Sequence, residues 1–190
     1  MPNEVSRRLF LAGAGSLATS ALSAAPSERT TVGMIAVGAR AHQLLEKLQN
    51  LERVEIASVF DGYTGRMERA IEKTGGRAKR AKSYQAILED PSIDAVTIAS
   101  PDHWHAKQCI EALEAGKHVY CEKPLTYTID EGLEIAAAVK RTGKVLQVGS
   151  QGISMPNQQR AREYVQSGKL GRVTMVRAYY NRNSSSGAWI

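Results

Sequence analysis

Short apolar runs alternate with segments of helical spacing through most of this 190-residue chain. The apolar runs predict β-strands at residues 31–37, 54–60, 78–82, 93–99, 118–121 and 144–149. The segments between them predict helices at residues 41–51, 65–73, 84–89, 104–115 and 129–141, the last with Thr128 as N-cap and Gly143 after its end. Strands that alternate with helices are typical of the α/β class, so residues 30–150 are predicted to form a doubly wound parallel sheet.

The pattern changes after Gly149. A helix is expected at Asn157–Gln166 and a longer strand at Arg172–Tyr180, followed by a polar stretch. One helix and one strand cannot bury a core of their own. We therefore expect residues 151–190 to be the beginning of a second domain whose remainder is missing.

The first 25 residues read as a targeting segment. Arg7 and Arg8 stand beside Leu9, Phe10 and Leu11, and a weakly apolar stretch of small residues follows. This arrangement is similar to a bacterial twin-arginine export signal, with small residues before Pro26 for cleavage. It predicts a periplasmic or otherwise exported protein. No other stretch reaches 18 apolar residues, so no membrane span is predicted.

The net charge of +6 changes this picture little. Basic residues cluster between Arg66 and Lys82, but Glu68 and Glu72 interrupt them at helical spacing, which is typical of a solvated helix face. Because no nucleic-acid reading motif accompanies the charge, no nucleic-acid partner is predicted. Attraction of a phosphorylated cofactor or an acidic sugar remains an alternative use of the charge.

The metal-ligating residues are too few for a predicted metal site. His105 and Cys109 are four residues apart and share a helix face, which is a zinc-like spacing. No second pair completes a set of ligands, so both are interpreted as core or cleft residues. A disulfide between Cys109 and Cys121 is not expected either, because twin-arginine cargo folds in a reducing compartment before export.

The first strand-to-helix turn carries a partial dinucleotide fingerprint. The usual Gly-x-Gly-x-x-Gly reads Ala36-x-Gly38-x-x-Ala41 here. Gly38 is the glycine that lets the backbone approach a pyrophosphate, and alanine is admitted at the last position. Alanine at the first position predicts a strained turn. Gly38, Ala39 and Arg40 are the candidate cofactor-binding residues of this turn.

Asp61 ends the second strand 23 positions after Gly38. At about this spacing an acid accepts hydrogen bonds from ribose hydroxyls, and it repels a 2′-phosphate. Asp61 therefore favours NAD over NADP. Arg40 and Arg66 lie close enough in sequence to argue for NADP, and a simple turn or helix-capping role for Asp61 is the structural alternative.

Two further polar groups follow strands on the same predicted edge. Ser100-Pro101-Asp102-His103-Trp104-His105 comes after the strand at 93–99, and His105 is placed to donate to a cofactor or substrate oxygen. The alternative is a purely structural role, in which Asp102 caps a helix and Trp104 packs against other side chains. Glu122-Lys123-Pro124 comes after the next strand, where ligands bind in open α/β sheets. Its lysine can hold an oxygen or move a proton, although a surface turn is the alternative.

These segments, with Gly116 to Thr126 and Val148 to Gln151, resemble the Gfo/Idh/MocA oxidoreductases over roughly residues 30–180. The resemblance implies a Rossmann domain followed by an α+β domain with an open antiparallel sheet. It also implies NAD, or NADP, and hydride transfer at a hydroxyl or carbonyl carbon of a sugar or cyclitol. The twin-arginine leader fits an exported branch of the family, and the full-length protein is expected to be a homo-oligomer.

The resemblance also assigns roles to residues. It implies that Lys123 is an active-site lysine, that Glu122 holds the nicotinamide ribose side, and that Gln151 lies near the nicotinamide. Ser100, Pro101 and His105 would line the cofactor cleft.

Three departures from the family pattern matter. Ala36 replaces the first fingerprint glycine, and Gly152-Ile153 stands where related sequences often carry a polar or arginine-bearing segment, so the resemblance assigns no substrate contacts there. The acid/base residues that the family carries further along in its second domain are absent. We therefore expect this chain alone to bind cofactor poorly or only in part and to perform no chemistry. Two alternatives stay open, a glycosidase that uses tightly held NAD for transient oxidation, and a non-catalytic nucleotide-binding module.

Overall fold

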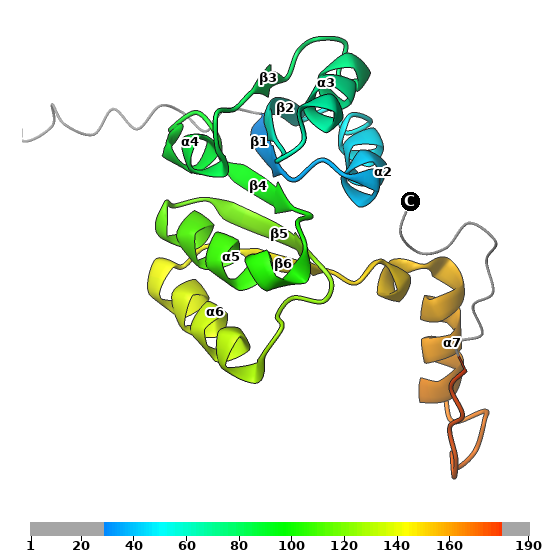
Figure 1. Cartoon of the computed structure of the whole chain (residues 1–190). Coiled ribbons are helices and arrows are strands. Elements are labelled where there is room, and N and C mark those ends of the chain that lie inside the picture. The colour runs from blue at the N-terminus through cyan, green and yellow to red at the C-terminus, as the bar shows by residue number, and fades with distance from the viewer. Residues whose placement is uncertain (1–28, 180–190) are drawn as a thin grey trace, which may run out of the picture. The chain divides into compact units, whose positions relative to one another are not determined.

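The structure is a computed structural model that describes residues 29–179, apart from the side chain of Gln151 (Figure 1). The predicted export signal, residues 1–25, lies outside the described residues. The chain divides into two units, Met1–Gly149 and Ser150–Ile190. This division falls one residue before the predicted one.

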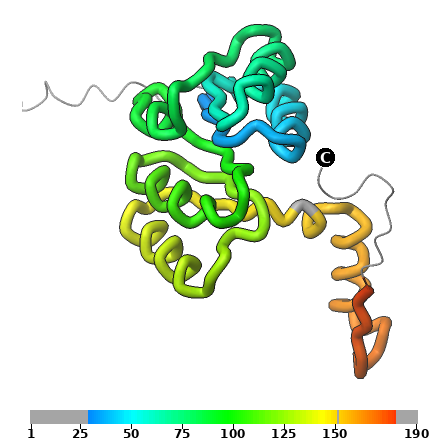
Figure 2. The backbone as a smooth tube through the Cα atoms, in the orientation of Figure 1, coloured from blue at the N-terminus to red at the C-terminus, as the bar shows by residue number. Residues whose placement is uncertain are grey.

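The first unit contains a six-stranded sheet with the order β3-β2-β1-β4-β5-β6 (Figure 1). Every neighbouring pair is parallel. The strands are β1 (Thr30–Ile35), β2 (Val54–Phe60), β3 (Lys79–Arg80), β4 (Ala95–Ile98), β5 (His118–Glu122) and β6 (Leu146–Gly149). The tube in Figure 2 shows the chain leaving the half with β1, β2 and β3 for the half with β4, β5 and β6. The predicted doubly wound parallel sheet of the Rossmann type is confirmed.

Helices connect the strands. They are α2 (Ala39–Leu48), α3 (Thr64–Lys73), α4 (Tyr84–Glu89), the 3-10 turn η1 (Asp102–Trp104), α5 (His105–Glu114) and α6 (Ile129–Thr142). The predicted helix at 104–115 therefore begins as a 3-10 turn. The predicted caps of the last helix are confirmed, because Thr128 and Glu131 form a capping box and Gly143 ends α6 with a left-handed φ of 66°.

The sheet separates two apolar cores. One lies with α2 and α3 and includes Met34 and Val59, both fully buried. The other lies with α4, α5 and α6 and includes Ile35 and Ile98. Met34 and Ile35 are neighbours in β1 yet belong to different cores, because successive strand residues point to opposite faces. This burial on both faces explains why the strands read as continuous apolar runs.

The second unit contains the 3-10 turn η2 (Gln151–Ser154) and α7 (Pro156–Gln166). The predicted helix at 157–166 is confirmed, and Pro156 occupies its first turn, where no backbone N–H is needed. The predicted strand at Arg172–Tyr180 is wrong as far as Tyr179, since residues 171–179 form no regular element. A strand needs a partner to satisfy its backbone groups, and alternating side chains alone do not supply one.

Candidate functional site

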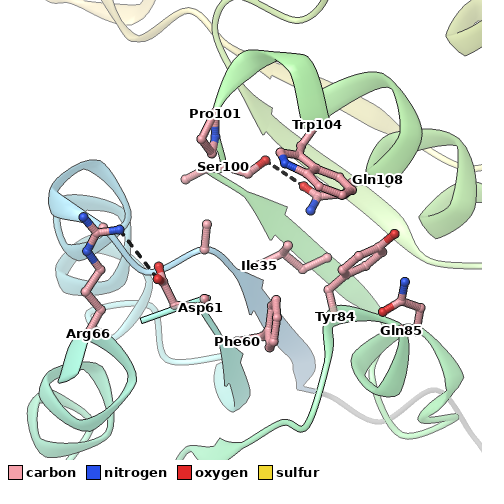
Figure 3. Close-up of a pocket in the computed structure, with 14 residues that line it drawn as sticks. Ile35, Phe60, Asp61, Arg66, Tyr84, Gln85, Ser100, Pro101, Trp104 and Gln108 are labelled. Carbon is pink, nitrogen blue, oxygen red and sulfur yellow. Dashed lines mark hydrogen bonds and ion pairs between the residues drawn. The ribbon is translucent and has the colours of Figure 1, made fainter. Parts of the chain in front are cut away.

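A pocket of about 400 Å³ lies at the carboxyl edge of the sheet, where β1, β2 and β4 end (Figure 3). Its walls are mostly apolar with a few polar groups, which is typical of a small-molecule site. The lining residues are Ile35, Ala36, Gly38, Phe60, Asp61, Gly62, Arg66, Tyr84, Gln85, Ala99, Ser100, Pro101, Trp104 and Gln108. Four of the predicted cofactor-binding residues, Gly38, Asp61, Ser100 and Pro101, are among them.

The turn from β1 to α2 forms one wall of this pocket. Ala36 has a φ of 62°, in the left-handed region that glycine adopts easily and alanine does not. Its N–H donates to Phe60 O at 2.8 Å, which holds the turn against the end of β2. The strain predicted from the missing fingerprint glycine is therefore confirmed.

Gly38 leaves space in which a ligand could approach the protein backbone. A Cβ added there would meet no atom within 4 Å. Gly38 is also the N-cap of α2, with no side-chain cap and no acidic residue in the first turn of that helix. Free N–H groups at a helix start attract anions. The open cradle at Gly38 therefore fits a dinucleotide pyrophosphate, with Ala39 as the first helical residue beside it.

Asp61 is bound mainly to the protein's own backbone. Its Oδ2 accepts from Val37 N and its Oδ1 from Tyr63 N, both at 2.9 Å, and its side chain is 5% exposed. The carboxylate thus ties the end of β2 to the β1 turn. The turn role that the sequence left open is confirmed, and any ribose contact would share oxygens that already have donors.

Arg66 offsets the charge of this carboxylate. Its Nη1 lies 3.6 Å from Asp61 Oδ1, and its side chain is 58% exposed (Figure 3). A guanidinium beside the acid weakens the argument that Asp61 repels a 2′-phosphate. The pair is compatible with either NAD or NADP.

The wall opposite Asp61 contains a hydrogen-bonded polar pair and a group of aromatic side chains. Ser100 Oγ donates to Gln108 Oε1 at 2.7 Å (Figure 3). Tyr84 contacts Trp104 edge-on, with ring centroids 6.5 Å apart, and Phe60 at 6.3 Å. Packing was the alternative that the sequence left open for Trp104, which here contacts Tyr84 and also lines the pocket. Sequence reasoning missed Phe60, Tyr84 and Gln108 as pocket residues. Tyr84 and Gln108 lie on helices, and no local motif marks which helical residue faces a pocket.

His105 lies behind this wall and does not line the pocket. It is 2% exposed, with Nδ1 2.7 Å from Pro124 O and Nε2 2.8 Å from Ser100 O. The sequence predicted that His105 donates to a cofactor or substrate oxygen and lines the cleft. In the structure its ring nitrogens face two backbone carbonyls of the protein instead.

Glu122 and Arg40 pair across the sheet edge. Arg40 Nε donates to Glu122 Oε1 at 2.8 Å, and Arg40 Nη1 donates to Gln43 Oε1 at 2.6 Å. Glu122 is 5% exposed, so its charge is buried beside a guanidinium. Burial raises the pKa of Tyr120, and the Glu122 charge raises it further. Two predicted cofactor residues are thus each other's partners.

Lys123 differs from its neighbour Glu122. Its side chain is exposed and forms no ion pair or hydrogen bond with any residue of the described range 29–179. It directly follows β5, and the Lys123–Pro124 peptide bond is cis. Its ammonium therefore remains available at the carboxyl edge.

The remaining predicted residue, Gln151, belongs to the second unit, so its contact with a nicotinamide stays a prediction. Within residues 29–179, no group of three His, Cys, Asp or Glu side chains could hold a metal ion. No helix in that range is long and apolar enough to cross a membrane.

Comparison with known proteins shows which family and which characterised proteins this chain resembles. The model of the oxidoreductase family GFO_IDH_MocA, which has an NAD-binding Rossmann fold, matches residues 30–150. The chain is 35% identical over 126 residues to an alpha-N-acetylgalactosaminidase of Shewanella oneidensis, a match of 62% of this chain and 27% of that protein. It is 36% identical over 111 residues to a levoglucosan dehydrogenase of Pseudarthrobacter phenanthrenivorans, a match of 58% of this chain and 28% of that protein. This chain thus spans little more than a quarter of the length of these curated relatives.

One solved structure extends the comparison. The 3-ketoreductase KijD10 of Actinomadura kijaniata, in complex with NADP and TDP-benzene, is 27% identical with a TM-score of 0.68. The similarity covers 74% of this chain and 43% of KijD10.

Proposed function

Because the chain belongs to the Gfo/Idh/MocA oxidoreductases, we propose that it forms the cofactor-binding half of an NAD(P)-dependent enzyme. The reaction proposed is hydride transfer at a hydroxyl or carbonyl carbon of a sugar or cyclitol derivative. The names of a levoglucosan dehydrogenase and a 3-ketoreductase among the similar proteins support this class of substrate.

One observation carries the proposal. Lys123 is exposed and unpaired within the described range, whereas Glu122 beside it is buried and paired with Arg40. An unpaired ammonium at the carboxyl end of a parallel strand lies where α/β sheets bind ligands. Lys123 is proposed to donate a hydrogen bond to the reacting oxygen of the substrate and to exchange a proton with it.

The other residues would hold the cofactor. Gly38 and the first N–H groups of α2 fit the pyrophosphate, because a Cβ at Gly38 meets nothing within 4 Å. Asp61 and Arg66 would face the adenosine ribose. A bound nicotinamide supplies the acceptor or donor of the hydride. The Arg40–Glu122 pair keeps a buried carboxylate neutralised beside this region.

Cofactor binding is the direct test. The purified protein is titrated with NAD⁺, NADH, NADP⁺ and NADPH by calorimetry and nicotinamide fluorescence. Saturable binding of at least one form is expected. No measurable affinity for any of the four forms would contradict the proposal.

A second candidate function rests on the similarity to the alpha-N-acetylgalactosaminidase. It is cleavage of a glycosidic bond by transient oxidation with tightly held NAD. Release of nitrophenol from a nitrophenyl glycoside without added NAD would favour this candidate. Reduction of added NAD⁺ by a free sugar or cyclitol, without glycoside cleavage, would favour the dehydrogenase. A non-catalytic nucleotide-binding module would bind cofactor and do neither.

Three further expectations are part of the proposal. The Arg7-Arg8 leader supports export by the twin-arginine route to the periplasm, which is tested by fractionation with an Arg7→Lys, Arg8→Lys variant. The full-length enzyme is proposed to be a homo-oligomer. The 190-residue chain alone is proposed to bind cofactor weakly or only in part and without turnover, since the resemblance places the acid/base residues in a second domain.

A further inference from the structure

His105 joins the two loops that carry the polar residues of the site. It is the first residue of α5, and its ring is 2% exposed. Nδ1 lies 2.7 Å from Pro124 O, in the loop after β5, and Nε2 lies 2.8 Å from Ser100 O, in the loop after β4. One side chain therefore spans the ends of two adjacent strands.

Both partners of the ring are acceptors. A backbone carbonyl oxygen cannot donate, so each contact is a hydrogen bond only if the ring nitrogen facing it carries a proton. A neutral imidazole has one N–H and would direct a lone pair at the second carbonyl. The ring therefore donates to at least one of the two carbonyls, and it donates to both only as the positively charged, doubly protonated ring.

We propose that His105 is a positioning residue whose ring bridges the two carbonyls and so fixes the loop that carries Lys123 to the wall of the cofactor pocket that carries Ser100. The significance for Lys123 rests on the proposed function. Pro124 follows Lys123 directly, and its ring fixes its own φ. A hydrogen bond to the Pro124 carbonyl therefore restrains the backbone that aims the Lys123 side chain.

Ser100, at the other end of the bridge that His105 forms, is also held in place. Ser100 contributes its backbone carbonyl to His105 and its Oγ to Gln108, which lies on the same helix. Ser100 and Gln108 both line the pocket (Figure 3). Helix α5 thus holds the pocket wall at two points and the Lys123 loop at a third, so a shift of one loop is transmitted to the other.

The ring protons are measured first, on the wild-type protein without ligand. Nitrogen-15 NMR of the histidine rings is expected to show, for His105, a ring N–H that exchanges slowly with water. A His105→Phe variant assigns the signal. A His105 ring N–H that exchanges as fast as those of exposed histidines would overturn the proposal.

The consequence for Lys123 is measured next. Reductive methylation with carbon-13 formaldehyde gives each lysine an NMR signal, and a Lys123→Met variant assigns the one at residue 123. His105→Phe keeps a buried ring but loses both ring nitrogens, so the Lys123 signal should move and cofactor affinity should fall about tenfold. Cys109→Ala is the control, because Cys109 is fully buried on the same helix and contacts neither carbonyl. It should leave the Lys123 signal in place and change affinity less than about twofold.

Equal behaviour of His105→Phe and Cys109→Ala would show that His105 only fills space, and would overturn the positioning role. A wild-type protein that binds no cofactor would contradict the proposed function instead. The ring and lysine signals would still decide the role of His105.

Discussion

Lys117 and Lys123 stand at opposite ends of β5 and are used in opposite ways. Lys117 precedes the strand and is 5% exposed, and its Nζ donates to Asp90 O at 2.5 Å and to Ile93 O at 2.8 Å. Lys123 follows the strand, is exposed, and has no partner among residues 29–179. The lysine at the amino edge of the sheet donates its hydrogen bonds within the protein, whereas the lysine at the carboxyl edge remains available.

The backbone at the two edges also differs. At the amino edge, Asp94 Oδ2 accepts from Thr31 N at 2.8 Å and Asp94 O accepts from His118 N at 3.0 Å. At the carboxyl edge the turn at Ala36 is strained and the space over Gly38 is open. Asp61 and Glu122 at the carboxyl edge are also held by the protein, so the site is marked by the exposed Lys123 and the open space at Gly38.

Replacing each lysine by methionine, which keeps the length of the side chain, tests the contrast most strongly. Lys117→Met should lower the free energy of unfolding by about 2 kcal/mol, because two carbonyls lose a charged donor while the cost of burying that charge also disappears. Lys123→Met should change it by less than about 0.5 kcal/mol. Urea unfolding followed by circular dichroism measures both.

Turnover should respond in the opposite order. In the complete enzyme Lys123→Met should lower kcat about 10²-fold or more, the usual contribution of a positioned proton donor. Lys117→Met should leave kcat of the folded fraction close to that of the wild type. Unchanged turnover in Lys123→Met would remove the reason for calling the carboxyl edge an active site.

Two glycines sharpen the comparison within the carboxyl edge itself. A Cβ at Gly149 would lie 2.7 Å from Tyr120 Oη and 2.9 Å from Glu122 Oε1, so Gly149→Ala should push on the buried Glu122. We expect it to lower the free energy of unfolding by about 1–3 kcal/mol, as overpacking does. Gly38→Ala should leave unfolding nearly unchanged, because Gly38 has a φ of −73° and open space around it.

Cofactor titration separates the two variants further. Gly38→Ala places a methyl group where the pyrophosphate is proposed to lie, so affinity should fall about tenfold or more. If Gly38→Ala instead binds cofactor like the wild type, the open space over Gly38 is not the phosphate site.

The fold was predictable because its signals are local. Buried parallel strands read as apolar runs, and Thr128 and Gly143 mark the ends of α6 by their own chemistry. The strand expected at Arg172–Tyr180 was wrong as far as Tyr179 because strand formation is not decided by a local signal. Strand formation needs a partner, and alternation in one segment says nothing about whether a partner is present.

The types of residue at the site were predictable from the sequence, but their hydrogen-bond and ion-pair partners were not. Asp61, Glu122 and His105 were each recognised as polar groups at strand ends. Their partners come from distant segments, such as Arg40, which is 82 positions from Glu122. Only the folded sheet brings these segments together, so sequence reasoning assigned to a ligand several atoms that the protein itself occupies.

The pH dependence of stability distinguishes the two edges without any ligand. Burial lowers the pKa of Lys117 from its ordinary value of 10.5, and the charges of Asp90 and Asp94 oppose this only in part. The folded protein therefore releases this proton at a lower pH than the unfolded chain. Between the two pKa values the unfolded chain binds more protons, so the free energy of unfolding should rise with pH in that window. A neutral amine still donates to both carbonyls.

The measurement is the difference between wild type and Lys117→Met in urea unfolding from pH 8 upward. Taking the difference cancels Tyr84 and Tyr120, whose pKa values burial raises and which act in the opposite direction above pH 10. The stability advantage of the wild type should grow as pH approaches 10.5. A constant or shrinking difference would mean that the Lys117 ammonium is not penalised by burial.

The smallest expected effect concerns the strain at Ala36. Ala36→Gly should raise the free energy of unfolding by about 0.5–1 kcal/mol, since relief of a left-handed alanine outweighs the extra freedom of glycine in the unfolded chain. Gly75 is the matched control, with a φ of 66° and no atom within 4 Å of an added Cβ, and it lies away from the pocket. Gly75→Ala should lower stability by a similar amount. Opposite changes of similar size would show that the backbone angle itself carries the strain. A neutral Ala36→Gly beside a destabilising Gly75→Ala would mean that the turn relaxes around Ala36, and that within residues 29–179 the carboxyl edge is distinguished by the unpaired Lys123 and the open space at Gly38.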